Sequence, residues 1–255
     1  MTAFEQYAPW YDLLYQDKDY ASEASFVDEQ LRRHGARPGA LLDLGCGTGV
    51  HAMMLARKGW RVAGIDLSAD MIRRAEIRLA ADPQQVTFRR GDVCDSGPER
   101  DFDAVVSLFH VASYQLNTSR LAAMLANAGI ALKPGGILLF DYWYGDAVRA
   151  QGVETRVKTV ERSPLRVTRI AQSDHDETKS RVRVNYTLFC EDTSQSAIHR
   201  IDEQHRLRYW FPVEIESLLA SAGFDTIGHY AWLSTEPPDS REWSAYSVAR
   251  KKITT

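Results

Sequence analysis

One stretch near the start of the chain constrains the fold more than any other. Residues 41–44 form a short, mostly apolar run, and alternate glycines follow at Gly45, Gly47 and Gly49. Such a run is typical of a buried parallel strand, and the apolar spacing from Val50 onward predicts a helix. Glycine allows the backbone to turn sharply and a ligand to approach it closely. The free N–H groups at the start of the following helix favour the binding of an anion. The stretch therefore predicts a strand, a ligand-binding turn and a helix.

A second strand is predicted at residues 61–66, and its last residue is Asp66. An acid about 20 residues after a glycine turn is suitably placed to bind the hydroxyl pair of a ribose. The turn differs from the G-x-G-x-x-G pattern of nicotinamide-binding proteins, because its third glycine, Gly49, comes early and Val50 occupies the sixth position.

The glycine turn with Asp66 downstream resembles the first two motifs of class I S-adenosylmethionine-dependent methyltransferases. Residues 90–93 resemble the segment that ends the third strand of that family and holds the adenine. The resemblance implies S-adenosylmethionine as the cofactor, and an unrelated Rossmann-like domain is the alternative. The cofactor-binding residues that it implies are Tyr11, Tyr20, Gly45, Cys46, Gly47, Asp66, Leu67, Met71, Asp92, Val93 and Leu108.

Composition excludes several classes of protein. A net charge of −3 provides no basic excess for binding nucleic acid, and 44% hydrophobic and 25% charged residues are ordinary for a soluble globular protein. No apolar run is long enough to cross a bilayer, and the N-terminus does not resemble a signal peptide. The three cysteines lack metal-ligand spacing and are expected to be reduced thiols. We expect a cytoplasmic enzyme with no metal site.

The chain alternates strand and helix patterns, which predicts an α/β fold: a Rossmann-like, doubly wound sheet of about seven strands whose last strand is antiparallel. Strands are predicted at residues 40–44, 61–66, 86–90, 102–108 and 136–142, with helices at 49–58, 69–81 and 118–132 and closing strands near 225–234 and 243–250. Within a single domain of residues 1–255, we expect an N-terminal helical cap, a cofactor-binding core and a β lid. Their expected ranges are 1–35 for the cap, 36–149 and 210–255 for the core, and 150–209 for the lid.

The lid is expected to be an antiparallel insertion after the fifth strand that covers the acceptor site. Its three β-type runs are 166–173, 181–190 and 197–209. Alternation sends about half of its arginines to solvent, and an arginine that faces inward would suit a diphosphate. Arg208 is the lid candidate for substrate binding, while Glu203 and His205 share the other face of the last run.

Two residues are candidates for proton transfer. His110 follows the fourth strand, where ligands of open α/β sheets bind, and an imidazole can take a proton at neutral pH. Tyr11 could also accept the proton, and Tyr11 and Tyr20 would attract the sulfonium through their aromatic faces. The alternatives are a structural histidine and tyrosines that pack on the surface.

Tyr142, Trp143 and Tyr144 end the fifth strand and are predicted to line the acceptor pocket; packing beneath the lid is the alternative.

A finer resemblance concerns residues 11–15, 18–20 and 47–51 and the aromatic run after strand five. These segments are similar to N-methyltransferases that act on nucleotide-linked amino sugars. The resemblance implies methylation of the amino group of a dTDP-linked amino sugar. Two alternative functions remain: an O- or C-methyltransferase, and a catalytically silent subunit that binds S-adenosylmethionine. The expected partners are a small-molecule acceptor and a second copy of the chain, with no nucleic acid and no membrane.

Overall fold

The computed structural model describes residues 8–95, 97, 100–192, 194 and 197–253. The first seven residues of the expected cap lie outside this range. Within it, no helix has the length and apolar character that a membrane crossing requires.

A seven-stranded sheet forms the core of the described chain, in the order β10-β11-β5-β4-β1-β2-β3. Its strands are β1 (Ala40–Leu44), β2 (Arg61–Asp66), β3 (Val86–Arg90), β4 (Phe102–Ser107), β5 (Leu132–Trp143), β10 (Phe224–Ala231) and β11 (Ser244–Lys251). β11 runs antiparallel to both of its neighbours, β10 and β5, and the other strand pairs of this sheet are parallel. This arrangement confirms the predicted doubly wound sheet with an antiparallel last strand.

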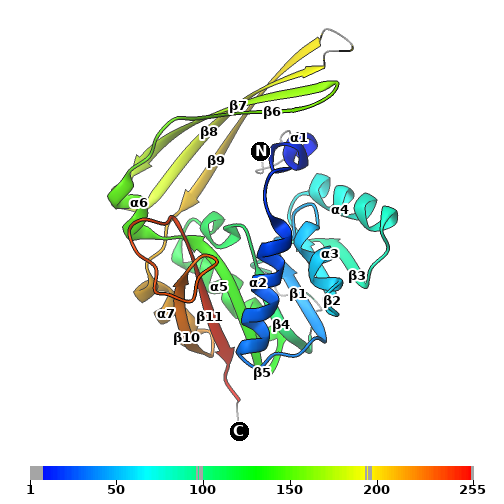
Figure 1. Cartoon of the computed structure of the whole chain (residues 1–255). Coiled ribbons are helices and arrows are strands. Elements are labelled where there is room, and N and C mark those ends of the chain that lie inside the picture. The colour runs from blue at the N-terminus through cyan, green and yellow to red at the C-terminus, as the bar shows by residue number, and fades with distance from the viewer. Residues whose placement is uncertain (1–7, 96, 98–99, 193, 195–196, 254–255) are drawn as a thin grey trace.

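Helices cover both faces of the sheet (Figure 1). The helices are α1 (Ala8–Leu14), α2 (Tyr20–Arg33), α3 (Val50–Ala56), α4 (Ala69–Ala81), α5 (Thr118–Ala131), α6 (Gly145–Gln151) and α7 (Pro212–Ser221), with 3-10 turns η1 (Val111–Tyr114) and η2 (Glu177–Lys179). Residues of α2 and α3 pack with Leu41 on one face. Residues of α5 and α7 pack with Leu42 and Leu44 on the other. The apolar run of β1 is therefore buried on both sides, as a central parallel strand requires.

A separate antiparallel sheet, in the order β6-β7-β8-β9, occupies the range expected for the lid and is called the lid below. Its strands are β6 (Arg156–Arg162), β7 (Leu165–Asp176), β8 (Arg181–Asp192) and β9 (Ala197–Arg208). Three of the four were predicted. The sequence pattern missed β6 because Val160 is its only buried residue, so apolar alternation is weak there.

The lid extends beyond the end of the core sheet opposite the C-terminus, and α1 lies between the two (Figure 1). Lid residues Val160, Val167 and Leu188 pack with Leu13 and Leu14 of α1. Hydrophobic burial of this kind fixes the lid against the N-terminal helices.

The two ends of the insertion leave the core at one point. Gly145 N donates to Trp210 O (2.9 Å), and Trp210 N donates to Trp143 O (2.9 Å). Trp210 is fully buried, and its Nε1 donates to Ala112 O at 3.1 Å. These bonds close the base of the lid on β5.

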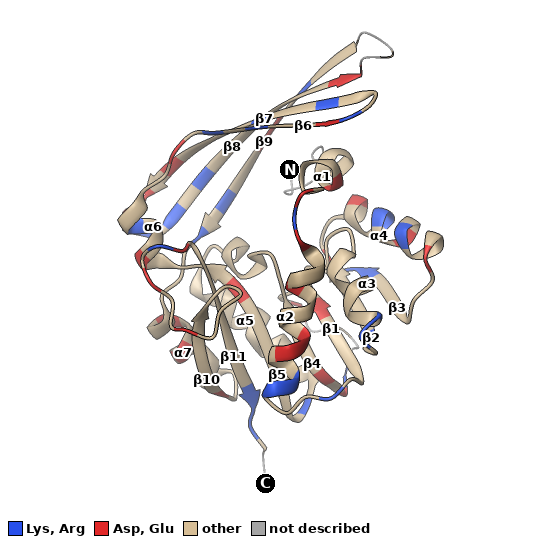
Figure 2. Ribbon diagram, in the orientation of Figure 1, with Lys and Arg blue, Asp and Glu red and all other residues tan. Residues whose placement is uncertain are grey.

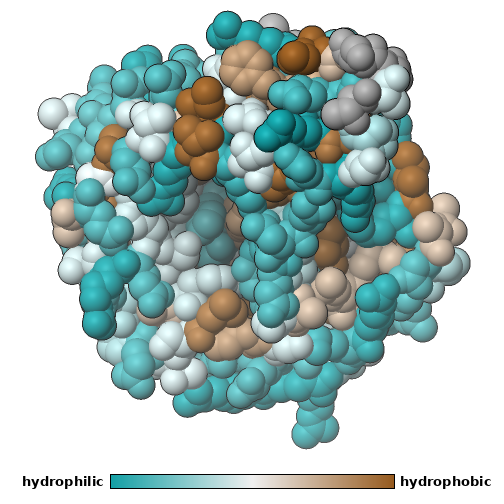
Figure 3. Space-filling view, turned by 45° about the horizontal axis from the view of Figure 1, so that its top comes forward, coloured by the Kyte–Doolittle hydropathy of each residue, from teal (hydrophilic) through white to brown (hydrophobic). Residues whose placement is uncertain are grey.

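The surface is mixed in character. Lysine and arginine occur along the lid strands and on α4 in Figure 2, with acidic residues on the same elements. The face in Figure 3 is largely hydrophilic, and its hydrophobic residues form small, separated groups. A large apolar patch of the kind that marks a membrane or protein contact is not seen on this face.

Candidate active site

A cavity opens at the carboxyl ends of β1, β2 and β4, where open α/β sheets bind ligands. All eleven residues that sequence comparison implied for the cofactor line it: Tyr11, Tyr20, Gly45, Cys46, Gly47, Asp66, Leu67, Met71, Asp92, Val93 and Leu108. The structure adds residues that the sequence did not single out, among them Asp43, His51, Phe109, Tyr114, Gln115 and Arg120.

The glycine turn forms the floor of the cavity. Gly45 has φ +85°, and a Cβ there would lie 2.4 Å from Val111 Cγ2, so η1 packs directly on its backbone. Gly47 has φ +55°, and a Cβ there would meet nothing within 4 Å. A side chain at Gly47 would therefore enter open space beside the cavity, which is the room that a bound cofactor needs.

Asp66 is held by two backbone donors. Its Oδ2 accepts from Gly47 N at 2.9 Å and its Oδ1 from Ser68 N at 2.8 Å. Burial raises the pKa of Asp66, while these two hydrogen bonds counteract that rise. A carboxylate can accept about four hydrogen bonds, so both oxygens keep capacity for the two ribose hydroxyls. The residues present fit an adenosine-containing cofactor.

Asp43, at the end of β1, is a second acid in the cavity wall. It is only 1% exposed, and its Oδ1 has no hydrogen-bond partner among the described residues. Burial, and then the charge of Asp66, raise the pKa of Asp43 to about 7. A buried acid of this kind is suited to bind a hydrogen-bond donor from a ligand.

Aromatic rings line one side of the cavity. Tyr11 packs on Tyr15 at 4.7 Å and lies edge-on to Phe109 at 6.3 Å between ring centroids. Tyr20 lies against the ring of His51 at 5.0 Å. Burial raises the pKa of Tyr20, so it stays a neutral phenol. Aromatic faces attract a cation, which suits the sulfonium of the implied cofactor.

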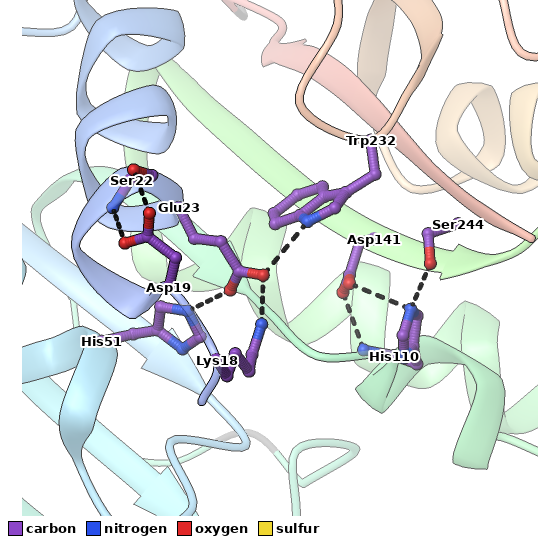
Figure 4. A network of polar contacts seen from close by, with 9 residues as sticks. All are labelled: Lys18, Asp19, Ser22, Glu23, His51, His110, Asp141, Trp232 and Ser244. Atoms are coloured by element: carbon purple, nitrogen blue, oxygen red, sulfur yellow. Dashed lines mark hydrogen bonds and ion pairs between the residues drawn. The ribbon is translucent and has the colours of Figure 1, made fainter. Parts of the chain in front are cut away.

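A buried ion network supports this wall (Figure 4). Glu23 of α2 contacts Lys18 and His51, whose Nε2 lies 2.8 Å from Glu23 Oε2. Burial raises the pKa of Glu23, but the hydrogen bonds from His51 and Lys18 outweigh it and lower the pKa to about 2. The Lys18 ammonium also lies 4.7 Å from the Phe109 ring centre. This network fixes the segment before α2 against the end of β4.

His110 lies at the end of β4 beside Asp141 of β5 (Figure 4). Its Nε2 is 2.8 Å from Ser244 Oγ and 3.6 Å from Asp141 Oδ2. Burial, and then the charge of Lys18, lower the pKa of His110 to about 4, and burial raises the pKa of Asp141 to about 7. The imidazole is therefore neutral at neutral pH. His110 itself does not line the cavity, although its neighbours Phe109 and Val111 do.

The three aromatic residues predicted for the acceptor pocket lie outside this cavity. Tyr142 is fully buried in the core, and Tyr144 is 7% exposed and bonds to Asp146. Trp143 packs on Trp243 at 5.2 Å between ring centroids. None of the three lines the cavity. Tyr142 and Tyr144 pack in the core cluster with residues of α5 and α7, and Trp143 is partly buried.

Arg208 also lies outside the cavity. Its Nη2 donates to Glu214 Oε1 at 2.6 Å, and its guanidinium stacks on Trp210 at 3.9 Å. Arg169 of β7 contacts the aromatic residues beside the cavity, and its Nη1 donates to Tyr15 Oη at 3.2 Å. It is half-buried, and its guanidinium lies over the ring of Tyr186 at 5.3 Å.

Comparisons with known proteins agree with this geometry. The family model described as a methyltransferase domain matches residues 41–136. The chain is 31% identical over 219 residues to dTDP-3-amino-3,4,6-trideoxy-alpha-D-glucopyranose N,N-dimethyltransferase of Streptomyces venezuelae, covering 85% of this chain and 89% of the relative. It is also 31% identical over 218 residues to dTDP-3-amino-3,6-dideoxy-alpha-D-glucopyranose N,N-dimethyltransferase of Streptomyces fradiae, covering 85% and 82%.

Solved structures resemble the whole chain. Streptomyces venezuelae DesVI superposes with a TM-score of 0.82 at 25% identity, covering 97% of this chain and 99% of the other. A sugar N-methyltransferase from Streptoalloteichus gives a TM-score of 0.80 at 26% identity, covering 95% and 93%. The chain belongs to the S-adenosylmethionine-dependent methyltransferases, in the family that includes the dTDP-amino sugar N,N-dimethyltransferases.

Proposed function

We propose that this chain transfers the methyl group of S-adenosylmethionine to the amino group of a dTDP-linked amino sugar. The match to DesVI carries the proposal, because it covers 97% of the chain and so includes the lid. The glycine turn and Asp66 are common to many methyltransferases, whereas the lid is the part that would meet the acceptor. The two relatives at 31% identity both act on dTDP-linked amino sugars by name.

The chemistry suits an amine acceptor. Bound S-adenosylmethionine supplies an electrophilic methyl group, so the protein has mainly to align the amine with it. Burial is the main cause of the lowered pKa of His110, and the same desolvation disfavours a protonated amine at the end of β4. An acceptor amine there would be held unprotonated, with its lone pair available. Tyr11 and His110 are our candidates for the groups that touch it.

The diphosphate of the acceptor requires a cationic partner on the lid. We propose Arg169, since it is half-buried on the lid side that packs on α1 and lies beside Tyr15. Arg183 and Arg200 are paired with Asp174 and Asp202 on exposed parts of the same sheet. In this proposal residues 1–35 and 150–209 enclose the acceptor, and the two core segments hold the cofactor.

Incubation of the purified chain with S-adenosylmethionine and dTDP-3-amino or dTDP-4-amino sugars tests the function. We expect mass spectrometry to show one or two added methyl groups on nitrogen. Transfer only to hydroxyl or carbon acceptors would assign an O- or C-methyltransferase. Tight cofactor binding without transfer to any acceptor would favour the alternative of a catalytically silent subunit. Light scattering would separately test the expected homodimer.

A further inference from the structure

A chain of three titratable side chains connects the cavity to the lid. Tyr114, at the end of η1, lines the cavity, and its Oη lies 2.7 Å from His205 Nδ1. His205 Nε2 lies 2.7 Å from Glu203 Oε1. The side chains of His205 and Glu203 are 1% and 7% exposed, so this part of β9 is closed to solvent.

The order of the hydrogen bonds defines the direction in which a proton would move. An ionised carboxylate only accepts hydrogen bonds, so Glu203 selects the imidazole tautomer with its proton on Nε2. His205 Nδ1 then accepts the hydroxyl proton of Tyr114. A phenol oxygen that donates its proton can accept another at the same time. Tyr114 is therefore arranged to take a proton on its cavity side as it passes its own to His205.

Two further titratable side chains of the lid lie near this chain of hydrogen bonds. The Tyr186 ring of β8 lies edge-on to His205 at 4.8 Å between centroids. Arg169 of β7 lies beyond it, with its guanidinium 5.3 Å from the Tyr186 ring centre. Among the described residues, His205 thus contacts Tyr114 through Nδ1, Glu203 through Nε2 and the ring of Tyr186 edge-on.

We propose that Tyr114, His205 and Glu203 form a proton relay that removes the proton released when the acceptor amine is methylated. This proposal rests on the proposed function and identifies the residues that would remove the proton in that reaction. The amine nitrogen forms the new N–C bond, and the C–S bond breaks with its electron pair remaining on sulfur. The proton on nitrogen passes to Tyr114 Oη, and the Tyr114 hydroxyl proton passes to His205 Nδ1. The resulting imidazolium is paired with the Glu203 carboxylate.

His110 does not provide the same exit. Its Nε2 is already shared between Ser244 and Asp141, and its lowered pKa makes it a weak proton acceptor. Tyr114 connects the core to the lid, so the relay is complete only when β9 lies against η1. Within the relay, Tyr114 is the residue that touches the amine, and His205 and Glu203 position it and hold the charge.

Three variants test the relay in the full-length protein with a dTDP-amino sugar. Tyr114→Phe and Glu203→Gln are expected to lower kcat about tenfold or more, with the Kd for S-adenosylmethionine by calorimetry within about twofold of wild type. Glu203→Gln should also move the acidic limb of the kcat–pH profile to lower pH, because the imidazolium loses its paired anion. Tyr209→Phe is the matched control. Tyr209 directly follows β9, its Oη lies 3.1 Å from His175 Nε2 of β7, and it does not line the cavity.

A second readout needs no acceptor. Nitrogen-15 NMR of the complex with S-adenosylhomocysteine should show His205 with its proton on Nε2 and with a hydrogen-bonded Nδ1. The Nδ1 signal should change in Tyr114→Phe, which lacks the hydroxyl that bonds to it. Failure of wild type to methylate any amino sugar would refute the proposed function, and the NMR spectrum would still test the relay. The relay would be overturned if both Tyr114→Phe and Glu203→Gln kept the wild-type kcat and pH profile. It would also be overturned if Tyr209→Phe lowered kcat equally, or if the NMR spectrum placed the proton on Nδ1 of His205.

Discussion

The backbone N–H of His110 donates a 2.8 Å hydrogen bond to Asp141 Oδ1, which joins the end of β4 to the neighbouring strand β5. His110 and the preceding Phe109 both have φ of 66°, a conformation that costs a non-glycine residue about 1–3 kcal/mol. The contact to Asp141 offsets that strain and sets the direction in which both side chains leave the strand.

Replacing His110 tests its place beside the acceptor. His110→Asn should reduce kcat at least about tenfold, equivalent to about 1.4 kcal/mol of transition-state stabilisation, because the neutral imidazole is lost at the strand end. The Kd for S-adenosylmethionine should stay unchanged by calorimetry, since His110 does not line the cavity. A weakened Kd at unchanged kcat would assign His110 to cofactor binding.

Asp66 is expected to dominate the polar binding of the cofactor. Asp66→Ala should weaken S-adenosylmethionine binding by about tenfold to a hundredfold, since hydrogen bonds to a charged group contribute about 1.5–3 kcal/mol. Calorimetric titration measures this, with Asp70→Ala as the control, because Asp70 of α4 pairs only with Arg73 in the interactions found. Equal affinity in the two variants would contradict the ribose role of Asp66.

The two turn glycines should respond differently to alanine. Gly45→Ala places a methyl group against Val111 and should lower the melting temperature, because that contact of 2.4 Å must be relieved. Gly47→Ala meets no atom within 4 Å, so it should unfold at a higher temperature than Gly45→Ala while binding S-adenosylmethionine more weakly. Differential scanning calorimetry and titration separate the effects; full cofactor affinity in Gly47→Ala would contradict the assigned floor of the cavity.

The raised pKa of Asp43 should make the free energy of unfolding depend on pH. Its pKa is about 7 in the folded protein and its ordinary value is 3.8, so between these values the folded protein binds more protons than the unfolded chain. The wild-type free energy of unfolding therefore decreases, through this residue, as the pH rises from about 4 to 7. Asp43→Asn lacks this loss, and its stability relative to wild type should increase across that range. Denaturant unfolding at several pH values measures it; a constant difference would show that Asp43 is not titrating there.

Arg169 should govern acceptor affinity. Arg169→Met should raise the KM for a dTDP-amino sugar with little change in kcat. A contact to the diphosphate, far from the reacting nitrogen, stabilises the bound substrate and the transition state equally. Arg183→Met is the control, because Arg183 is exposed and paired with Asp174. Equal KM values for the two variants would remove Arg169 from the diphosphate site.

The cofactor half of the site could be predicted because its signals are local. Gly45, Gly47 and Asp66 are defined by spacing along two adjacent strands, and parallel pairing of β1 with β2 brings them together. Tyr114 and His205 are 91 residues apart, so only the tertiary fold reveals that they meet. Tyr142 shows a different limit: an aromatic residue at a strand end looks the same in sequence whether it faces a pocket or the core. Tyr142 packs in the core cluster with residues of α5 and α7, and the sequence pattern does not contain that packing.

The closed base of the lid has an evolutionary consequence. Because Gly145 and Trp210 are bonded to each other, the intervening 64 residues form a loop on the sheet, and the core strands continue as though it were absent. Insertions of other lengths or shapes could be exchanged at this junction without reordering the core. Under the proposed function, new acceptor preferences can then arise in one segment of the gene while the methyl-donor machinery is inherited intact.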